Sequence, residues 1–356
     1  MLKRIELNNF RNHKKFSADL NNTSILVGLN ATGKTSVLEA ISLVSAGRSF
    51  RTDDKRNLVN FNSDYGRVVV DDLEIFIQKS PRLMIQAKER GVKRKLSQFI
   101  GTLKSVVFSP ETINIITGAP AERRRFLDIM ISQSDKEYLR ALSEYTRVRR
   151  QRNSLLEMIK AGRARESDLK FWDLELEKQG RVITRKRVEV IDFLNMLLPG
   201  LYQQISGQKK AILALTYFNK SGDDLAQKLA ENRVREIAYG ATIYGPHRDD
   251  LEFRLDNTNM QQFASRGELR SAILALKIGE VRFLEKEVAS RSSLDQKSDS
   301  PILLLDDIFS EFDVLRREHL NDLILQYQSV ITTTDKEHLT DKILRESKII
   351  ELKSNN

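Results

Sequence analysis

The sequence has no cysteine among its 356 residues. Disulfide bonds and thiolate metal sites are therefore excluded, and a reducing compartment is the natural setting for such a chain. Histidine is scarce too, since only four are present and they form no cluster. His247 stands beside two acids in the run 244–250, Tyr-Gly-Pro-His-Arg-Asp-Asp. Without histidine partners, this run predicts neither a metal site nor a serine-protease triad.

Long apolar runs are also missing. No run approaches the roughly 20 apolar residues that span a bilayer, and the first residues contain no apolar signal-peptide core. Apolar residues still make up 40% of the chain, which is ample for a core. The length allows about two domains. We expect a soluble, cytoplasmic protein with no membrane partner.

The charge is basic and unevenly distributed. The net charge is +10, and residues 119–190 hold 18 Lys and Arg against 12 Asp and Glu, a net +6. A basic excess often indicates a nucleic-acid or membrane-surface partner, although solubility alone explains a modest one. The concentration of charge in the middle of the chain favours a contact with DNA there.

The strongest motif lies within residues 23–41. A β-branched and aliphatic run, 23–27, predicts a buried strand, and Val37, Leu38 and Ile41 recur afterwards at helical spacing. Between them, Gly-Leu-Asn-Ala-Thr-Gly-Lys-Thr fits G-x-x-x-x-G-K-[ST] at every fixed position. A chance match is disfavoured, because a strand precedes the motif and a helix follows it.

This arrangement is typical of a phosphate-binding loop. Glycines let successive backbone N–H groups point at phosphate oxygens, and the helix N-terminus adds partial positive charge. Lys34 would reach the β- and γ-phosphates, and the Thr35 hydroxyl would ligate Mg²⁺. The sequence therefore predicts a nucleoside triphosphate site. Its residues are Gly28, Leu29, Asn30, Ala31, Thr32, Gly33, Lys34, Thr35 and Ser36.

A second motif, Pro-Ile-Leu-Leu-Leu-Asp-Asp, occupies residues 301–307. Four consecutive aliphatic residues predict a strand buried on both faces, and the two acids follow where a parallel sheet presents its ligand edge. Asp306 would complete the Mg²⁺ shell begun by Thr35. Asp307 is placed to orient or deprotonate an attacking water. We therefore expect Lys34 and Asp307 to be the catalytic residues.

A long helix is predicted to begin at Ser265-Arg-Gly-Glu268 and to run toward Glu287. Ser265 and Glu268 fit a capping box, in which each side chain accepts from the other residue's backbone N–H. Alternatively, Ser265 and the helix dipole face a γ-phosphate. The two interpretations are compatible.

Residues 119–198 are highly charged and nearly free of glycine and proline. Apolar residues recur at helical spacing, and a turn around Gly162 predicts an antiparallel helix pair that ends at Pro199-Gly200. The basic excess makes Arg181, Arg185 and Arg187 candidates for DNA contacts. A solvated helix pair without a ligand is the alternative.

Strand patterns lie on both sides of the helical segment. We therefore predict a nucleotide-binding domain in two parts, residues 1–118 and 208–356, interrupted by a helical insertion at 119–207. A polar flexible link is predicted at 290–300, and a short helix is predicted from Lys336. The predicted strands are 67–70, 73–79, 82–88, 103–108, 211–218, 251–255 and 329–334.

The order of these motifs resembles that of the ABC-type ATPase heads of SMC-like proteins. An early P-loop is followed by a helical insertion, Ser-x-Gly at a helix start, Leu-Leu-Leu-Asp-Asp and the loop Phe-Ser-Glu-Phe-Asp at 309–313. Within that group, the chain resembles the RecF family along essentially its whole length. The stretches that carry this resemblance are Asn9-Phe-Arg-Asn12, Gly47-Arg-Ser49, Phe108-Ser-Pro-Glu111, Ala121-Glu-Arg-Arg-Arg-Phe-Leu-Asp128, Gly245-Pro-His-Arg-Asp-Asp-Leu251 and Leu304-Leu-Asp-Asp307.

The resemblance implies an α/β fold: an ABC-type ATPase head, with P-loop, mixed sheet and helices, that carries an inserted helical lid domain. It implies ATP and Mg²⁺ as cofactors, slow DNA-stimulated hydrolysis that serves as a switch, and duplex or gapped DNA as a ligand. It also implies a homodimer that forms on ATP, in which Ser265, Gly267 and Glu268 of one copy meet the ATP held by the other. The implied partners are RecR and possibly RecO and RecA; RecA would be helped to load at gapped DNA.

The chain departs from the ABC pattern in three places. Arg266 and Leu269 stand in the signature where the usual pattern has mostly Gln, and Thr334-Asp335 stands where many heads carry a switch histidine. Asp307 stands where most ABC ATPases have Glu; the RecF family shares this Asp, whose shorter arm suggests slow hydrolysis. The alternative function, an SMC-type structural DNA-bridging ATPase, would need coiled-coil arms far longer than residues 119–207.

Overall fold

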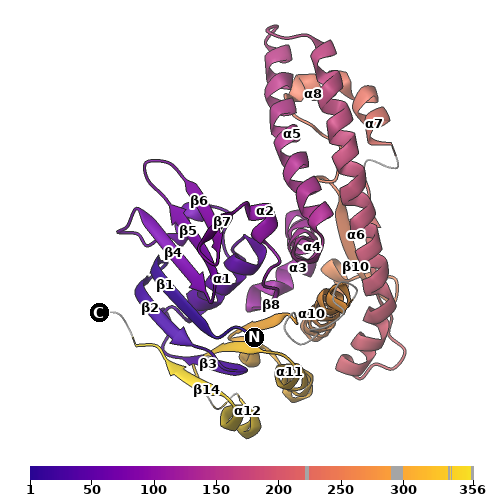
Figure 1. Ribbon diagram of the computed structural model, residues 1–356. Helices are drawn as coiled ribbons and strands as arrows, with labels where there is room; N and C mark the ends of the chain where they lie inside the picture. The colour runs from indigo at the N-terminus through magenta and orange to yellow at the C-terminus, as the bar shows by residue number, and fades with distance from the viewer. Residues whose placement is uncertain (221–223, 290–299, 336, 338, 354–356) are drawn as a thin grey trace. The chain divides into compact units, whose positions relative to one another are not determined.

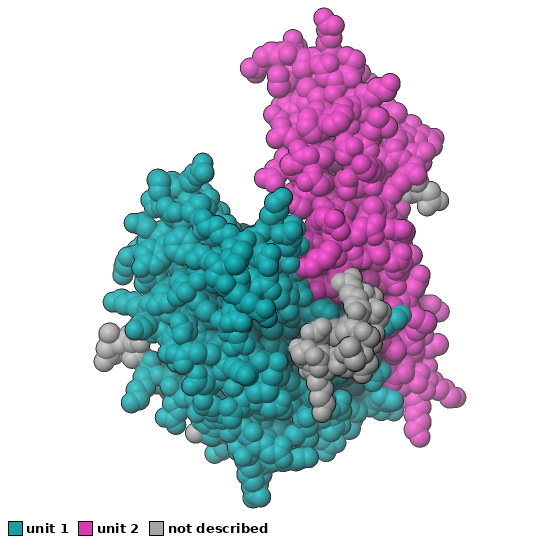
Figure 2. Space-filling view, in the orientation of Figure 1, with its two compact units in different colours: residues 1–113, 204–207, 270–356 teal, residues 114–203, 208–269 magenta. Residues whose placement is uncertain are grey.

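The computed structural model describes residues 1–220, 224–289, 300–335, 337 and 339–353. The chain folds into two compact units (Figure 2). Unit 1 comprises residues 1–113, 204–207 and 270–356, and unit 2 comprises residues 114–203 and 208–269. In the described part of the chain, none of the helices combines the length and the apolarity that crossing a bilayer requires.

Unit 1 contains an antiparallel sheet with the strand order β2-β1-β4-β5-β6-β7 (Figure 1). Alternate residues of its strands, such as Ile5, Leu7, Val68 and Val70, are buried, as expected for a sheet with one covered face. The predicted strands at 67–88 are confirmed to within two residues. The bounds are β1 (Arg4–Phe10), β2 (His13–Asp19), β4 (Tyr65–Val70), β5 (Leu73–Gln78), β6 (Met84–Glu89) and β7 (Val92–Arg94).

The second sheet of unit 1 is parallel and has the order β14-β3-β13-β12-β8. Residues 302–305 are almost completely buried, which confirms the predicted strand with two covered faces. The predicted mixed sheet is thus realised as one antiparallel and one parallel sheet. The bounds are β3 (Thr23–Val27), β8 (Ser105–Phe108), β12 (Ile302–Asp306), β13 (Ser329–Thr333) and β14 (Lys348–Glu351).

Helix α1 (Lys34–Ala46) contacts strands of both sheets. Every residue of this helix except Thr35 is buried, so it is enclosed on all sides and unites the two sheets in one apolar core. The parallel arrangement brings the carboxyl ends of β3, β13 and β12 to one edge, where the P-loop begins.

Short helices and two longer ones complete unit 1. The predicted link at 290–300 lies outside the described residues except for Ser300, and so does Lys336, the start of a predicted helix. A described helix follows at α12. The bounds are η1 (Lys55–Leu58), α2 (Leu96–Phe99), η2 (Pro110–Ile113), α10 (Arg266–Ala289, which begins in unit 2), η4 (Ile308–Glu311), α11 (Val314–Gln326) and α12 (Asp341–Glu346).

Unit 2 is dominated by two long helices, α5 (Lys136–Lys160) and α6 (Leu169–Ser206), which lie side by side (Figure 1). A three-stranded antiparallel sheet, β11-β10-β9, belongs to the same unit. The remaining bounds are α3 (Asn114–Thr117), α4 (Pro120–Ser134), η3 (Glu166–Asp168), β9 (Leu213–Phe218), α7 (Leu225–Glu231), α8 (Arg233–Tyr239), β10 (Asp250–Leu255), β11 (Thr258–Asn259) and α9 (Met260–Phe263).

Helix α6 does not end at Pro199, as the sequence predicted, but continues to Ser206. A proline inside a helix removes one backbone hydrogen bond and crowds the preceding turn. The flanking residues Leu198, Leu201 and Tyr202 are buried, and their packing outweighs that local cost.

The structure divides the chain differently from the sequence prediction. The border after the N-terminal part lies at residue 113 rather than 118, and residues 208–269 belong to unit 2 instead of the nucleotide-binding domain. Strands β9 and β10 pair with each other, and β10 packs on α4. A strand pattern in a sequence does not reveal which sheet the strand joins, and this is why the prediction differed.

A candidate nucleotide site

The loop between β3 and α1 has the backbone geometry that its glycines allow. Gly33 has φ +98°, in the left-handed region that favours glycine, and an added Cβ would lie 2.3 Å from His13 Nε2. A Cβ on Gly28 would lie 2.6 Å from the carbonyl oxygen of Leu352. Close approaches therefore favour glycine at both fixed positions of the motif, and the positive φ favours it at Gly33 in addition.

Lys34 folds back over this loop. Its Nζ donates hydrogen bonds to the carbonyl oxygens of Gly28, at 2.7 Å, and Leu29, at 2.9 Å. The residue is only 7% exposed, and burial lowers the pKa of its ammonium group, while the carboxylates of Asp307 and Asp306 oppose the shift. A phosphate at the loop would offer Lys34 a fully charged partner in place of two neutral carbonyls.

Thr35, Asp306 and Thr332 form a compact polar group at the sheet edge. Asp306 Oδ1 accepts hydrogen bonds from Thr35 Oγ1 at 2.8 Å and from Thr332 Oγ1 at 2.7 Å. Burial raises the pKa of the Asp306 carboxyl, and the two hydroxyl donors act against that rise. The structure thus brings together the two residues that were predicted to ligate Mg²⁺.

These oxygens fit a magnesium ion. Mg²⁺ prefers hard oxygen ligands and is usually held by one or two carboxylates together with substrate phosphates and water. Among the described residues, no group of three His, Asp or Glu side chains could hold a metal ion alone. Thr35 and Asp306 therefore suit an ion that arrives with a phosphate.

Asp307 has a left-handed backbone, with φ +48°, and follows Asp306 directly. Its N–H donates to Thr332 Oγ1 at 3.0 Å, so the neighbouring strand β13 fixes its position. Asp307 and Glu111 line the same cavity as Lys34. The backbone of Asp307 is thus fixed at the edge of the cavity that Lys34 also lines.

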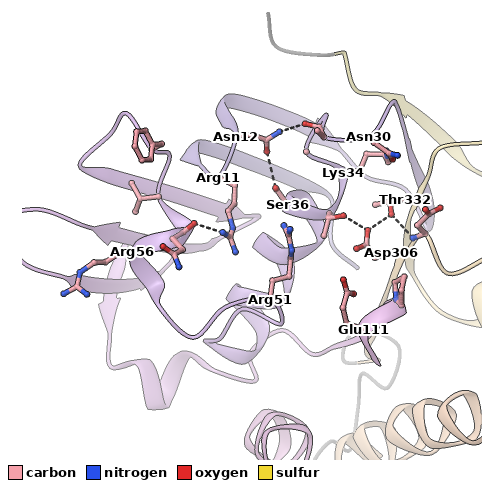
Figure 3. A pocket seen from close by; sticks show the side chains of 18 of the residues that line it. Arg11, Asn12, Asn30, Lys34, Ser36, Arg51, Arg56, Glu111, Asp306 and Thr332 are labelled. Carbon is pink, nitrogen blue, oxygen red and sulfur yellow. Dashed lines mark hydrogen bonds between the residues drawn. The ribbon is translucent and has the colours of Figure 1, made fainter. Parts of the chain in front are cut away.

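The cavity in unit 1 has a volume of about 920 Å³ (Figure 3). This is within the usual range for ligand sites, about 300–1,000 Å³. Cations outnumber carboxylates in its lining, which favours an anionic ligand. The charged lining residues are Arg11, Lys34, Arg51, Arg56 and Lys79 against Glu111, Asp306 and Asp307.

The β1–β2 turn contributes to the site, although no motif in the sequence predicts this. Asn12 Nδ2 donates to the carbonyl oxygen of Ala31 at 3.0 Å, and Ser36 Oγ donates to Asn12 Oδ1 at 3.2 Å. A ring nitrogen of His13, Nε2, lies 3.0 Å from the carbonyl oxygen of Gly33. Hydrogen bonds from the turn therefore stabilise the P-loop. Only the resemblance of stretch 9–12 hinted at a role here.

A buried carboxylate, Glu39 on α1, holds the arginine side chains at the cavity. The Arg11 guanidinium donates to both of its oxygens, at 2.6 and 2.8 Å, and Arg51 lies 3.8 Å away. Ser49 Oγ also donates to Glu39. In the sequence, Glu39 is a single charged residue of a predicted helix and resembles an ordinary surface residue. The cluster was therefore not predicted.

The predicted signature residues begin α10. Ser265 Oγ accepts from the N–H of Glu268 at 3.3 Å, and Glu268 Oε2 accepts from the N–H of Ser265 at 2.8 Å, so the capping box is present. Ser265 is exposed and, like Gly267, is not among the residues that line the cavity.

The three arginines predicted to contact DNA have different surroundings. Arg187 is 2% exposed and donates to Tyr138 Oη, the carbonyl oxygen of Pro246 and Asp128 Oδ1. Its predicted DNA contact was wrong, because the guanidinium is buried and already paired. Side chains of Arg181 and Arg185 are 65% and 57% exposed and form ion pairs at the surface with Glu177 and Glu137 respectively.

Two stretches that carried the family resemblance meet around Arg187 in unit 2. Arg123 Nε donates to Asp250 Oδ1, and Arg124 donates to the carbonyl oxygen of Asp249, both at 2.8 Å. Tyr217 Oη donates to the Asp249 carboxylate. Residues 121–128 and 245–251 therefore form one buried polar network, and the observed contacts give them a structural role.

The parallel sheet, the P-loop and the Thr35–Asp306 pair define a nucleotide-binding protein of the P-loop class. The family of AAA ATPase domains matches residues 1–196. The chain is 33% identical to the DNA replication and repair protein RecF of Bacillus cytotoxicus, over 98% of this chain and 96% of that protein. The RecF protein of Bacillus cereus strain AH820 is also 33% identical, over 97% and 95%. The chain belongs to the RecF family.

Solved structures agree with this assignment. A structure of the recombination mediator protein RecF with ATP has a TM-score of 0.85 at 32% identity and covers 95% of this chain and 93% of its own. An Smc head domain from Pyrococcus furiosus has a TM-score of 0.51 at 15% identity, covering 99% and 94%, and supports the fold alone. The predicted ATPase-head fold is confirmed.

Proposed function

We propose that this protein binds ATP with Mg²⁺ and acts, as an ATP-dependent DNA-binding protein, in DNA replication and recombinational repair. The observation that carries the proposal is the hydrogen bond from Thr35 to Asp306 beside the P-loop, since it unites a phosphate site with a carboxylate suited to Mg²⁺. Relatives that match nearly the whole chain bear the name DNA replication and repair protein, and the solved structure of one relative contains ATP.

On binding, Lys34 would exchange the carbonyl oxygens of Gly28 and Leu29 for the β- and γ-phosphates. Backbone N–H groups at the start of α1 would donate to phosphate oxygens. Magnesium, held by Thr35 and Asp306, would neutralise charge on the β- and γ-phosphate oxygens. Asp307 would orient the attacking water and accept its proton. Its side chain, shorter than that of Glu, is consistent with slow hydrolysis that serves as a switch.

The finer features of the proposal rest on family resemblance. Ser265 and Gly267 would contact the γ-phosphate of ATP bound to a second copy, which makes the dimer ATP-dependent with two equivalent sites. Arg181 and Arg185, exposed on α6, would contact duplex or gapped DNA. RecR, and possibly RecO and RecA, would be the partners in the cytoplasm, because a solved relative is described as a mediator of the RecFOR pathway.

The test is DNA binding by the wild-type protein and by Lys34→Met, with ATP, with ADP and without nucleotide, on duplex, single-stranded and gapped DNA. Methionine keeps the length of the side chain but removes the charge. We expect ATP to strengthen DNA binding by the wild-type protein and to leave DNA binding by Lys34→Met unchanged, because the variant should not bind ATP. Equal responses of the two proteins to ATP would contradict the proposal.

A further inference from the structure

Phe61 is the most exposed of the large hydrophobic side chains in the described part of the chain, at 92%. One exposed apolar residue on a surface carries no meaning by itself. Phe61, however, lines the same cavity as Lys34, Thr35 and Asp306, together with Val59. The cavity therefore has an apolar, aromatic part as well as a part suited to phosphate.

The chain around Phe61 is held in place by backbone hydrogen bonds. The N–H of Arg11 donates to the carbonyl oxygen of Leu58, and the N–H of Asn60 donates to that of Asn9, both at 2.8 Å. Asn60 Nδ2 also donates to the carbonyl oxygen of Arg11 at 2.7 Å. Residues 58–60 thus run along the end of β1, and the aromatic side chain follows at a fixed place.

Lys79, at the end of β5, secures the other side of this segment. Its Nζ donates to the carbonyl oxygen of Phe61 at 3.2 Å, and its N–H donates to that of Asp64 at 2.6 Å. The backbone of Phe61 is anchored while its ring is open to solvent. Such a ring can receive a flat ligand without prior rearrangement of the loop.

The phosphate part and the aromatic part of the cavity are connected by the β1–β2 turn. Asn12 contacts the P-loop at Ala31, and its neighbour Arg11 contacts residues 58–60. Figure 3 shows Lys34 and Asp306 toward one end of the cavity and Arg56 toward the other, with Arg11 between them. A ligand with phosphates at the P-loop therefore has room to extend along Arg11 toward the other end.

We propose that Phe61 is the base-binding residue of this site, and that the purine ring of a nucleoside triphosphate stacks on its face. The inference deepens the proposed function and rests on triphosphate binding at the P-loop. Base–aromatic stacking is effective for any base, but a purine offers a larger ring surface than a pyrimidine. Phe61 would then set a preference for purine over pyrimidine nucleotides, whereas Lys34 and Thr35 would bind the triphosphate and Mg²⁺, which do not depend on the base.

The test compares ATP, CTP and inorganic tripolyphosphate, each with Mg²⁺, by titration calorimetry. Phe61→Ala should weaken ATP binding about tenfold, as expected for the loss of a base–aromatic stack, and CTP binding less. Binding of tripolyphosphate, which has no base, should not change. Phe61→Tyr should retain the affinity for ATP. Phe171→Ala is the matched control, since Phe171 is an exposed phenylalanine on α6 outside the cavity.

A spectroscopic variant gives a second, independent measurement. Phe61→Trp adds a tryptophan to a sequence whose only other one is Trp172, and the fluorescence of the new residue should change with ATP but not with tripolyphosphate. Equal weakening of ATP and tripolyphosphate by Phe61→Ala, or no weakening of either, would overturn the assignment of Phe61. A wild-type protein that binds neither ligand would overturn triphosphate binding itself, so the two failures are distinct.

Discussion

Thr35 Oγ1 lies 2.8 Å from Asp306 Oδ1, although the two residues are 271 positions apart in the sequence. The contact follows from the order of the parallel sheet, in which β13 is the single strand between β3 and β12. Parallel strands present their carboxyl ends at one edge, so the residues that follow β3 meet those that end β12. Thr332, on β13 itself, completes the group by donating to the same oxygen of Asp306.

Replacing Asp307 with Asn should separate ATP binding from hydrolysis. Asparagine tolerates the left-handed backbone found at this position, where φ is +48°, so the fold should be preserved. It cannot accept a proton from the attacking water, and loss of a general base lowers rates about 100-fold or more. We expect wild-type ATP affinity and a long-lived ATP state, measured by calorimetry and phosphate release. Hydrolysis at the wild-type rate would contradict the role of Asp307.

The parts of the site that the sequence predicted are those with a local pattern. The P-loop has fixed spacing, and the aliphatic run before Asp306 specifies a buried strand whose end lies at the ligand edge. The Arg11–Glu39 pair lacked such a pattern, because it depends on a turn and a helix whose contact arises only in the folded core. Tertiary contacts of this kind have no signature in spacing.

The helical spacing around Arg187 identifies the face of α6 on which it lies. It lies four residues after Ile183 and four before Ile191, and both isoleucines are buried on α6. Residues four apart share a helix face. The face of Arg187 was therefore the core face, whereas the composition of the segment suggested only a basic surface.

Arg187→Ala should destabilise the protein strongly. Removal of one partner from a buried ion pair leaves Asp128 without its guanidinium, and such losses cost about 3–5 kcal/mol. Arg181→Ala is the matched control on the same helix, because exposed ion pairs contribute only about 0–1 kcal/mol. Urea unfolding followed by circular dichroism measures both. Similar losses for the two variants would refute the structural role of Arg187.

The double variant Arg181→Ala, Arg185→Ala should reduce the salt dependence of DNA binding. Phosphate contacts release counterions, so losing two of them should flatten the log–log slope on duplex DNA by about 2 units, at roughly 0.9 per contact. Fluorescence anisotropy between low and moderate salt measures the slope. Arg90→Ala, an exposed arginine of unit 1, is the control. An unchanged slope in the double variant would locate the DNA surface elsewhere.

His247 should make folding stability depend on pH. Its Nε2 lies 3.1 Å from the carbonyl oxygen of Thr242, which can only accept, and its Nδ1 lies 2.7 Å from Tyr145 Oη. These contacts suit a neutral ring. Burial, reinforced by the charge of Arg149, lowers the pKa of His247 to about 3.

The sign of the effect follows from proton binding. The unfolded chain protonates His247 below about pH 6.5, while the folded protein does not until about pH 3. The stabilisation is therefore complete above about pH 6.5 and decreases as the pH falls toward 3. When the pH is lowered from 7.5 to 5, the free energy of unfolding of the wild-type protein should fall by up to about 2 kcal/mol more than that of His247→Gln. Urea unfolding at both pH values tests this, and equal losses would contradict the prediction.

Ser265→Arg should distinguish a role of Ser265 in the proposed ATP-dependent dimer from a role as a helix cap. If Ser265 faces the γ-phosphate of ATP on a second copy, Ser265→Arg should block closure with a long side chain while leaving ATP binding at the P-loop intact. If Ser265 is only the N-cap of α10, its loss should cost about 1 kcal/mol of stability and leave assembly unchanged. Sedimentation of both proteins with ATP and with ADP, which lacks the γ-phosphate, distinguishes these outcomes.

Ser265→Asp separates the cap from the phosphate contact more sharply. Aspartate is as good an N-cap as serine, so the hydrogen bond from the N–H of Glu268 and the stability of α10 should be retained. Its negative charge would nevertheless repel a γ-phosphate. We expect Ser265→Asp to unfold like wild type and to stay monomeric with ATP. Normal ATP-dependent dimerisation of both variants would show that Ser265 acts as a cap alone.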